Sequence, residues 1–278
     1  MSDIFSGLEK LGFQNTKEIK LFEEEKKNKT KSVREKQQKM IKDILYDRKL
    51  ICPVCGEDIN IRSVKAGKAK LLSSDLDLRP KYDIITPYLY DVILCNCCGY
   101  AALSRFFSKI TRTQASWIKN QISTAYKGRF YPEEYTFEMA IERYKLALLN
   151  SVVKKAKDSE KAYICLKLAW LYRSVSEEIM TNDNYDKQKL KENNDYERAF
   201  VEKAYVGFVS AYEKESFPVC GMNEITVTYL IGELSRRLGK NDESLRWISK
   251  VIISKNANDR LKNKARDVKD LIKNNNQN

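Results

Sequence analysis

The sequence predicts a mainly α-helical fold with a small β unit near its N-terminus. Three observations support this prediction. After Gly99, apolar residues recur at the three- and four-residue spacing of amphipathic helices. Only 10 Gly and 5 Pro interrupt the 278 residues, so long helices are possible. Between residues 51 and 100, β-branched and aromatic residues indicate short strands, and two cysteine pairs flank them.

Residues 1–43 are expected to form a helical, lysine-rich N-terminal arm. In the segment "EEEKKNKTKSVREKQQK", residues 23–39, the only apolar side chain is that of Val33. A segment of this composition cannot bury one helical face against a core. We therefore expect an exposed helix or a partly disordered arm.

Residues 44–110 are expected to form a small zinc-ribbon-like β unit. The segment "DINIRSV" alternates apolar and polar residues and places Ile59 and Ile61 on one side of a strand. The segment "YLYDVILC" is rich in β-branched and aromatic residues, as a second strand would be, and Pro80 and Pro87 lie just before it. A unit this small cannot bury enough apolar surface to fold alone, so it needs a further stabilising element.

Two C-x-x-C-G sequences, "CPVCG" at 52–56 and "CNCCG" at 95–99, supply that element. In a zinc knuckle the residue after the second cysteine tends to need a positive φ, which glycine adopts without strain. Cys97 is followed by another cysteine rather than glycine, so it does not fit the ligand register. The sequence therefore predicts a Zn²⁺ site with four ligands, Cys52, Cys55, Cys95 and Cys98. Cys97 is then a spare thiol that does not bind the metal.

Four protein ligands leave no open position on the metal for water, so the predicted Zn²⁺ is structural. A four-thiolate iron site, as in rubredoxins, is an alternative, because it also uses two such knuckles. A thioredoxin-like redox pair is disfavoured, since the surrounding sequence lacks a βαβ pattern. The 39 residues between Cys55 and Cys95 exceed the usual ribbon spacing, so the unit carries an insertion.

Other reactive residue types lie outside the four ligands. Cys165, on an apolar helix, is expected to pack in the core, and Cys220 either packs or has a redox or ligand role. Cys97 has the same redox or alternate-ligand option. The acidic loop Asp75–Asp83, in "SSDLDLRPKYD", has two interpretations. Its carboxylates either bind a metal or do acid–base chemistry, or they cap turns and pair with arginine.

Residues 111–278 are expected to form a tetratricopeptide-like α-helical domain. The clearest unit is "YLIGELSRRLGKNDESLRWISKVI", in which the first helix carries the small Gly232. The second helix presents Trp247, Ile248 and Val251 as its buried face. Large side chains on one helix seated against small residues on its partner are typical of such repeats. An ordinary helical bundle is the alternative.

Composition excludes several classes of function. The chain has no histidine, which excludes Ser-His and Cys-His catalysis and histidine-liganded zinc. The sequence has no apolar run long enough for a transmembrane helix, and its first residues lack a signal-peptide pattern. We therefore expect a protein of the reducing cytoplasm. The net charge is +13, and residues 236–278, with 12 basic and 5 acidic side chains, contribute +7.

The order of these motifs resembles a bacterial family of unknown function, domain-of-unknown-function family 2225. The shared features are "LYDRKLICPVCG", "SDLDLRPKY", "YDVILCNCCGYAAL", "LKLAWLYR" and "YLIGELSRRLG", over roughly residues 44 to 255. The resemblance implies a zinc-ribbon-like start followed by tetratricopeptide-like helices. The family's usual second knuckle, C-P-x-C-G-Y-A-A, supports Cys95 and Cys98 as ligands, although Asn96 replaces the proline and Cys97 fills the variable position. It implies no activity.

Three functions follow as hypotheses. The first is a non-catalytic cytoplasmic interaction module, whose helices bind an unknown protein or peptide partner. The second is a nucleic-acid binder in which Tyr82, Tyr88 and Tyr90 stack on bases. Residues 51–110, with 8 basic and 6 acidic side chains, are only weakly basic, which disfavours it. The third is an enzyme of unknown type. No membrane partner is expected.

Overall fold

A computed structural model describes residues 41, 43–181 and 184–275. By its internal contacts the chain divides between Asp43 and Ile44, and Ile44–Asn278 form one compact unit. The predicted arm, residues 1–43, lies outside the described residues except for positions 41 and 43. The predicted β unit, 44–110, and helical domain, 111–278, are parts of the same compact unit.

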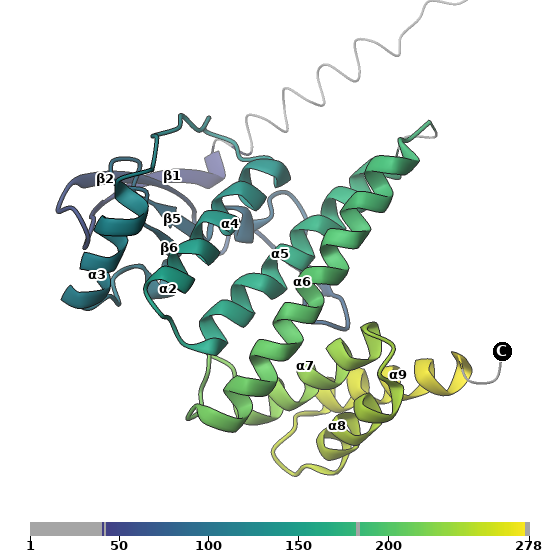
Figure 1. Cartoon of the computed structure of the whole chain (residues 1–278). Helices are drawn as coiled ribbons and strands as arrows, with labels where there is room; N and C mark the ends of the chain where they lie inside the picture. Colours follow the sequence, from purple (N-terminus) through teal and green to yellow (C-terminus); the bar gives the residue numbers. More distant parts are fainter. Residues whose placement is uncertain (1–40, 42, 182–183, 276–278) are drawn as a thin grey trace, which may run out of the picture. The chain divides into compact units, whose positions relative to one another are not determined.

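Among the described residues, three antiparallel two-stranded sheets make up the β part (Figure 1). In the first sheet, alternation buries Ile59 and Ile61 as the sequence predicts. A short 3₁₀ helix, η3 (Pro87–Tyr90), precedes the last hairpin. The three hairpins are β1 (Leu45–Ile51) with β2 (Asp58–Val64), β3 (Leu71–Ser74) with β4 (Pro80–Tyr82), and β5 (Val92–Leu94) with β6 (Ala101–Leu103).

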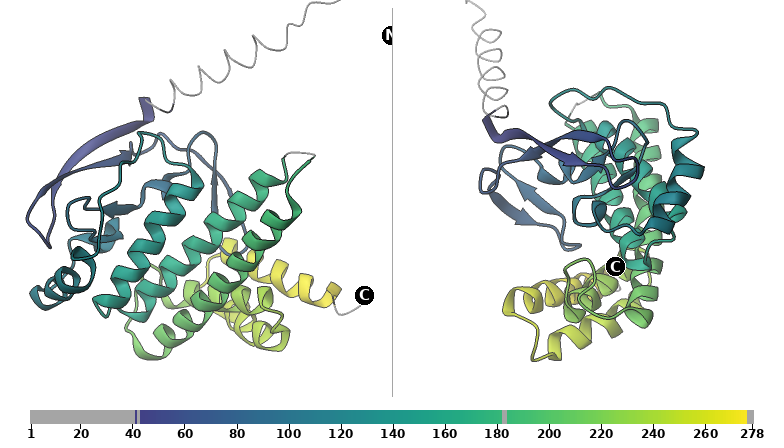
Figure 2. Two further views of the ribbon diagram at one scale, coloured as in Figure 1. Left: turned by 45° about the horizontal axis from the view of Figure 1, so that its top comes forward. Right: turned by 90° about the vertical axis from the view of Figure 1, so that its left-hand side faces the viewer.

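Helices dominate the remainder of the chain, so the predicted mainly α fold with a small β unit is confirmed. Successive helices from α4 to α9 contact one another, and α5 and α6 are the longest pair (Figures 1 and 2). None of the helices in the described ranges is long and apolar enough to cross a membrane. The helical elements are α2 (Ser104–Phe107), α3 (Arg112–Ile118), the π-helical turn η4 (Lys119–Ser123), α4 (Phe137–Val153), α5 (Asp158–Ile179), α6 (Lys187–Lys214), α7 (Glu224–Arg237), α8 (Asn241–Ile253) and α9 (Asp259–Asn275).

The contact between α7 and α8 follows the predicted rule of small residues against large ones. A Cβ atom added to Gly232 would lie 2.8 Å from Ile248 Cδ1 and 3.2 Å from Trp247 Cβ. Gly207 plays a similar part between α6 and α5, where an added Cβ would lie 2.8 Å from the Cβ of Ala162. Both glycines therefore allow the neighbouring helix to approach closely.

Helix α4 joins the β part to the helices through buried polar contacts. The Tyr144 hydroxyl, fully buried, donates to the backbone oxygen of Tyr88 at 2.8 Å. The Arg143 guanidinium donates to the Val92 oxygen at 2.6 Å. Because these bonds satisfy backbone groups that leave water, removing them would leave buried acceptors unpaired. The β5–β6 hairpin and η3 are thus fixed to α4 by specific hydrogen bonds.

Candidate metal centre

The first knuckle is the turn that joins β1 to β2. The backbone N–H of Gly56 donates to the Cys52 oxygen at 2.9 Å, and the Cys52 N–H donates to the Glu57 oxygen at 2.9 Å. Gly56 has φ of +82°. Most residues other than glycine are strained in this conformation, so the glycine requirement predicted from the sequence is confirmed.

The second knuckle repeats this geometry between β5 and β6. The Gly99 N–H donates to the Cys95 oxygen at 2.9 Å, and the Cys95 N–H donates to the Tyr100 oxygen at 2.8 Å. Gly99 has φ of +72°, and an added Cβ would lie 2.5 Å from Tyr126 Cγ. Glycine is therefore needed here for two reasons, the backbone conformation and the ring packed against it.

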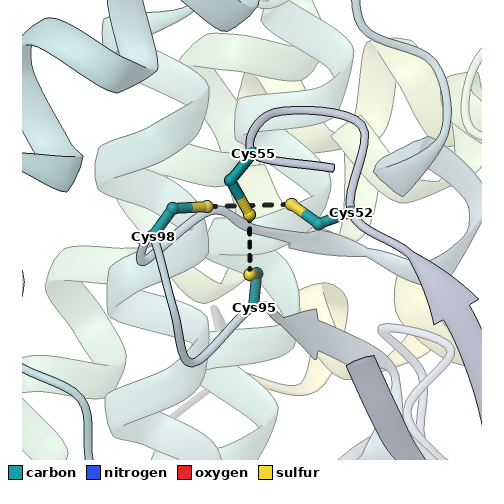
Figure 3. A group of neighbouring side chains, drawn as sticks. All are labelled: Cys52, Cys55, Cys95 and Cys98. Carbon is teal, nitrogen blue, oxygen red and sulfur yellow. Dashed lines mark hydrogen bonds between the residues drawn. The ribbon is translucent and has the colours of Figure 1, made fainter. Parts of the chain in front are cut away.

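The two knuckles bring four sulfur atoms together from opposite hairpins (Figure 3). All four Sγ atoms lie within 4.8 Å of one another. Cys52 Sγ is 3.7 Å from Cys98 Sγ, and Cys55 Sγ is 3.5 Å from Cys95 Sγ. A disulfide bond would be about 2.05 Å long, whereas a tetrahedron with Zn–S bonds of about 2.3 Å has sulfur–sulfur edges of about 3.8 Å. The spacing therefore fits four thiolates around one metal ion.

Burial and electrostatics also fit a cation among these thiols. Cys52, Cys95 and Cys98 are buried, while Cys55 is partly exposed. Hydrogen bonds from Cys95 and Cys98 lower the pKa of the Cys52 thiol to about 4, and the neighbouring Cys52 sulfur raises the pKa of Cys98. Four clustered sulfurs cannot all ionise without a positive charge between them, and a divalent cation supplies that charge.

Surrounding side chains hold the second knuckle in place. Asn96 stands where the family that the sequence resembles usually has proline. Its side-chain oxygen accepts a hydrogen bond from the Tyr126 hydroxyl at 2.8 Å and another from the Arg129 backbone N–H at 2.9 Å. The Ser123 hydroxyl, in η4, donates to the Cys98 oxygen at 2.8 Å. Asn150, in α4, donates to the Gly99 oxygen at 3.1 Å. These contacts orient the chain around the cysteines, as hydrogen bonds to neighbouring groups do at metal sites.

The remaining cysteines lie outside the four-sulfur cluster. Cys97 is exposed at the tip of the second knuckle. Cys165 is buried in the apolar core as predicted, and burial raises its pKa to about 12. The Cys220 thiol donates to the Ser159 oxygen at 3.2 Å, and burial raises its pKa to about 11. At neutral pH, Cys165 and Cys220 are therefore overwhelmingly protonated, which disfavours thiolate chemistry.

The acidic loop Asp75–Asp83 takes part in ion pairs rather than forming an open carboxylate site. Asp77 has 0% exposure, and Arg79 has 2%. Arg79 Nε donates to Asp75 Oδ2 at 2.7 Å, and its other nitrogens reach Glu177 on α5. Asp77 accepts the backbone N–H of Arg79 and so caps a turn, whereas Asp83 accepts the N–H groups of Lys70 and Ile84 at the open end of the β3–β4 hairpin. Of the two readings left open by the sequence, the geometry matches turn capping and pairing with arginines.

The same network contains residues that sequence reasoning did not identify. Arg173 on α5 and Arg237 on α7 both donate to the Asp77 carboxylate, and both also donate to Glu197 on α6 at 2.7 Å. We call this set the Asp77 network. Its members are balanced in charge, with four cations and four anions: Arg79, Lys81, Arg173 and Arg237 with Asp75, Asp77, Glu177 and Glu197.

Two of the tyrosines proposed to stack on nucleic-acid bases are engaged in packing. Tyr88 and Tyr90 are each 7% exposed. The Tyr88 ring lies edge-on to Trp170 with centroids 6.1 Å apart, and Tyr90 stacks on Tyr135 at 4.7 Å. Tyr82, on β4, is partly exposed. The two buried rings therefore offer no open face to a nucleic-acid strand.

Comparison with known proteins identifies the family but no activity. A curated relative from Borreliella burgdorferi, described as an "Uncharacterized protein", is 24% identical over 162 residues. The match covers 50% of this chain and 56% of that relative, so it spans little more than half of the relative's length. No solved structure matches the chain. The family model "Uncharacterized protein conserved in bacteria (DUF2225)" matches residues 45–272, and the chain belongs to this family.

Proposed function

We propose that the protein is a non-catalytic cytoplasmic scaffold, in which a structural Zn²⁺ holds the β unit and the helices bind another protein. The observation that carries this proposal is the closed set of four thiols. Four protein ligands complete a tetrahedral shell and leave no position for water or substrate. Such a site stabilises a fold and performs no Lewis-acid chemistry.

The helices support the scaffold part of the proposal. Pairs such as α7 and α8 pack through a glycine on one helix and large side chains on the next, as tetratricopeptide-like units do. Arrays of such units present extended surfaces to peptides or proteins. The absence of histidine from the sequence and the high pKa values of Cys165 and Cys220 leave few groups suited to catalysis near neutral pH.

Metal analysis tests the zinc part directly. The purified protein should contain one zinc per chain and lack the visible absorption of iron–thiolate sites. Cys98→Ser should lose the metal and aggregate or melt earlier, whereas Cys97→Ser, one position away and outside the cluster, should retain it. Full zinc occupancy with an unchanged melt in Cys98→Ser would refute the assignment. Iron in the wild-type protein would support the rubredoxin-like alternative instead.

Affinity purification from the native cell tests the scaffold part. One half of the lysate is treated with nuclease and the other half is not. Partners that survive nuclease support protein binding, and an isolated partner must bind the purified chain again. Partners that disappear after nuclease would instead support the nucleic-acid alternative, for which the affinity should fall steeply with salt.

A further inference from the structure

A second candidate site lies away from the cysteines, in a groove at the ends of three helices. The groove is formed where α4 begins, α5 ends and α6 begins, and its volume is about 690 Å³. Helix α5 contacts both of the other two helices (Figures 1 and 2). A space of this size lies within the range of ligand-binding sites. The side chains that line it therefore decide what it can bind.

The lining of the groove is partly apolar. Leu89 of η3 and Val175 of α5 contribute side chains that are buried. Phe137 of α4 and Ile179 of α5 are half-buried, and Tyr185, which precedes α6, is 36% exposed. These last three side chains keep apolar surface in contact with water. Such surface is stabilised when an apolar side chain of a partner covers it.

Carboxylates line the groove beside these apolar side chains. Glu138 lies in the first turn of α4 and Glu178 in the last turn of α5, and both are exposed. No lysine or arginine of the described residues pairs with either of them. Asp186 accepts the backbone N–H groups of Gln188 and Lys189 and so caps α6. Among the described residues of the lining, three carboxylates against the one ammonium of Lys189 give −2, in a chain whose net charge is +13.

Glu178 stands where its own helix disfavours a negative charge. The last turn of a helix carries a partial negative charge from its unpaired carbonyl groups, so a carboxylate there lowers helix stability. Its neighbour Glu177 is compensated by an ion pair with Arg79, whereas Glu178 has no such pair among the described residues. Local rules of this kind are typically broken at functional sites. Glu178 is therefore the residue of the groove that most directly indicates a cationic ligand.

We propose that the groove binds a basic segment of a partner protein that also carries apolar side chains. Apolar side chains of the segment cover Phe137, Ile179 and Tyr185. Its lysines or arginines pair with Glu138 and Glu178. The apolar lining distinguishes such a segment from a simple polycation, which offers no apolar surface. The inference rests on the proposed scaffold function and names the kind of partner that the helices hold.

Fluorescence anisotropy on the full, metal-loaded chain tests the proposal with three mixtures of short labelled peptides. The first mixture alternates Leu, Ile or Phe with Lys or Arg, the second alternates the same apolar residues with Asp or Glu, and the third alternates Ser with Lys or Arg. The first should bind about tenfold more tightly than either of the others. Because the whole chain carries +13, long-range attraction favours the acidic mixture, so a preference for the first mixture arises locally. Equal or tighter binding of the second or third mixture, or no binding of the first, would overturn the proposal.

Charge-reversal variants locate the binding in the groove. Glu138→Lys combined with Glu178→Lys should weaken binding of the first mixture about tenfold, because like charges then face each other. Both residues are exposed, so the fold should be retained. The matched control, Glu202→Lys with Glu213→Lys, changes the total charge equally at exposed positions of α6 and should leave the affinity unchanged. Unchanged affinity in the groove variant, or equal weakening in both double variants, would overturn the assigned site.

A native partner distinguishes failure of the groove assignment from failure of the scaffold function. A protein recovered by affinity purification is titrated with the wild-type chain, the groove variant and the control variant. Weaker binding to the groove variant alone supports the proposal. Equal binding to all three overturns the groove assignment and leaves the scaffold function standing. Absence of any protein partner overturns the scaffold function itself, and with it the partner proposed here.

Discussion

Removing the charge of Asp77 gives a quantitative test of how the acidic loop is used. Asp77 is fully buried, and its carboxylate accepts hydrogen bonds from Arg173 and Arg237. Asp77→Asn keeps the shape of the side chain but leaves the Asp77 network with four cations and three anions. Removing one partner of a buried ion pair typically costs about 3–5 kcal/mol, because the other charge stays buried without compensation.

The exposure of the two arginines sets where in this range the effect should fall. The side chain of Arg173 is 13% exposed and that of Arg237 is 23% exposed, so water can solvate part of the unpaired charge. We therefore expect the free energy of unfolding of Asp77→Asn, measured in urea melts, to be about 3 kcal/mol lower than that of the wild type. In a thermal melt this corresponds to a fall of about 6–12 °C, at about 2–4 °C per kcal/mol. The zinc content should not change, since the network and the metal site do not share residues.

Two further variants separate loss of charge balance from loss of shape. Asp77→Asn combined with Arg237→Gln restores equal numbers of cations and anions and should be more stable than the sum of the single changes by about 1 kcal/mol or more. Asp83→Asn, in the same loop but exposed, should cost less than about 0.5 kcal/mol. If the free energy of unfolding of Asp77→Asn lies within about 1 kcal/mol of the wild-type value, the stability of the loop does not depend on this buried charge and the reasoning is wrong.

Three other predictions concern the knuckles, the thiols and the metal. Gly56→Ala should lower the free energy of unfolding in urea melts by about 1–2 kcal/mol, because alanine is strained only by the positive φ at this position. Gly99→Ala should lower it by about 1–3 kcal/mol more, because its Cβ would also clash with Tyr126. Equal losses in the two variants would contradict the packing argument. Alkylation of Cys220 in the folded protein should accelerate about tenfold per pH unit up to its pKa of about 11, whereas a rate already flat at pH 8 would contradict a raised pKa. A strong chelator should lower the melting temperature and release one zinc per chain, and an unchanged melt after metal loss would show that the ion does not stabilise the fold.

The cluster of four cysteines could be predicted from the sequence because the signal is local. Each knuckle places two cysteines and a glycine within five residues, and the glycine conformation fixes which thiols enter the four-sulfur cluster. This rule assigned Cys97 outside the cluster, where the structure places it. The small-against-large contact of Gly232 with Ile248 was predictable for a similar reason, since both lie in one helical hairpin.

The Asp77 network and the burial of the tyrosine-rich segment could not be predicted in this way. Asp77 and Arg173 are 96 positions apart, and Asp77 and Arg237 are 160 apart. Their charges are common on protein surfaces, so nothing in the local pattern distinguishes a buried partner from a solvated one. The tyrosine-rich segment was recognised, but which of its rings are buried depends on α4 and α5, which pack against it only in the folded chain.

The four-cysteine cluster and the Asp77 network fix different parts of the β unit. The cysteines join the tips of the first and third hairpins, and their apolar surroundings include residues of α3 and η4. The loop of the second hairpin instead reaches α5, α6 and α7 through the Asp77 network, and its Leu76 oxygen accepts the Tyr229 hydroxyl of α7 at 2.7 Å. This second attachment explains the insertion between the knuckles. A longer connection is needed because the chain leaves the first pair of clustered cysteines, contacts the helices and returns to supply the second pair.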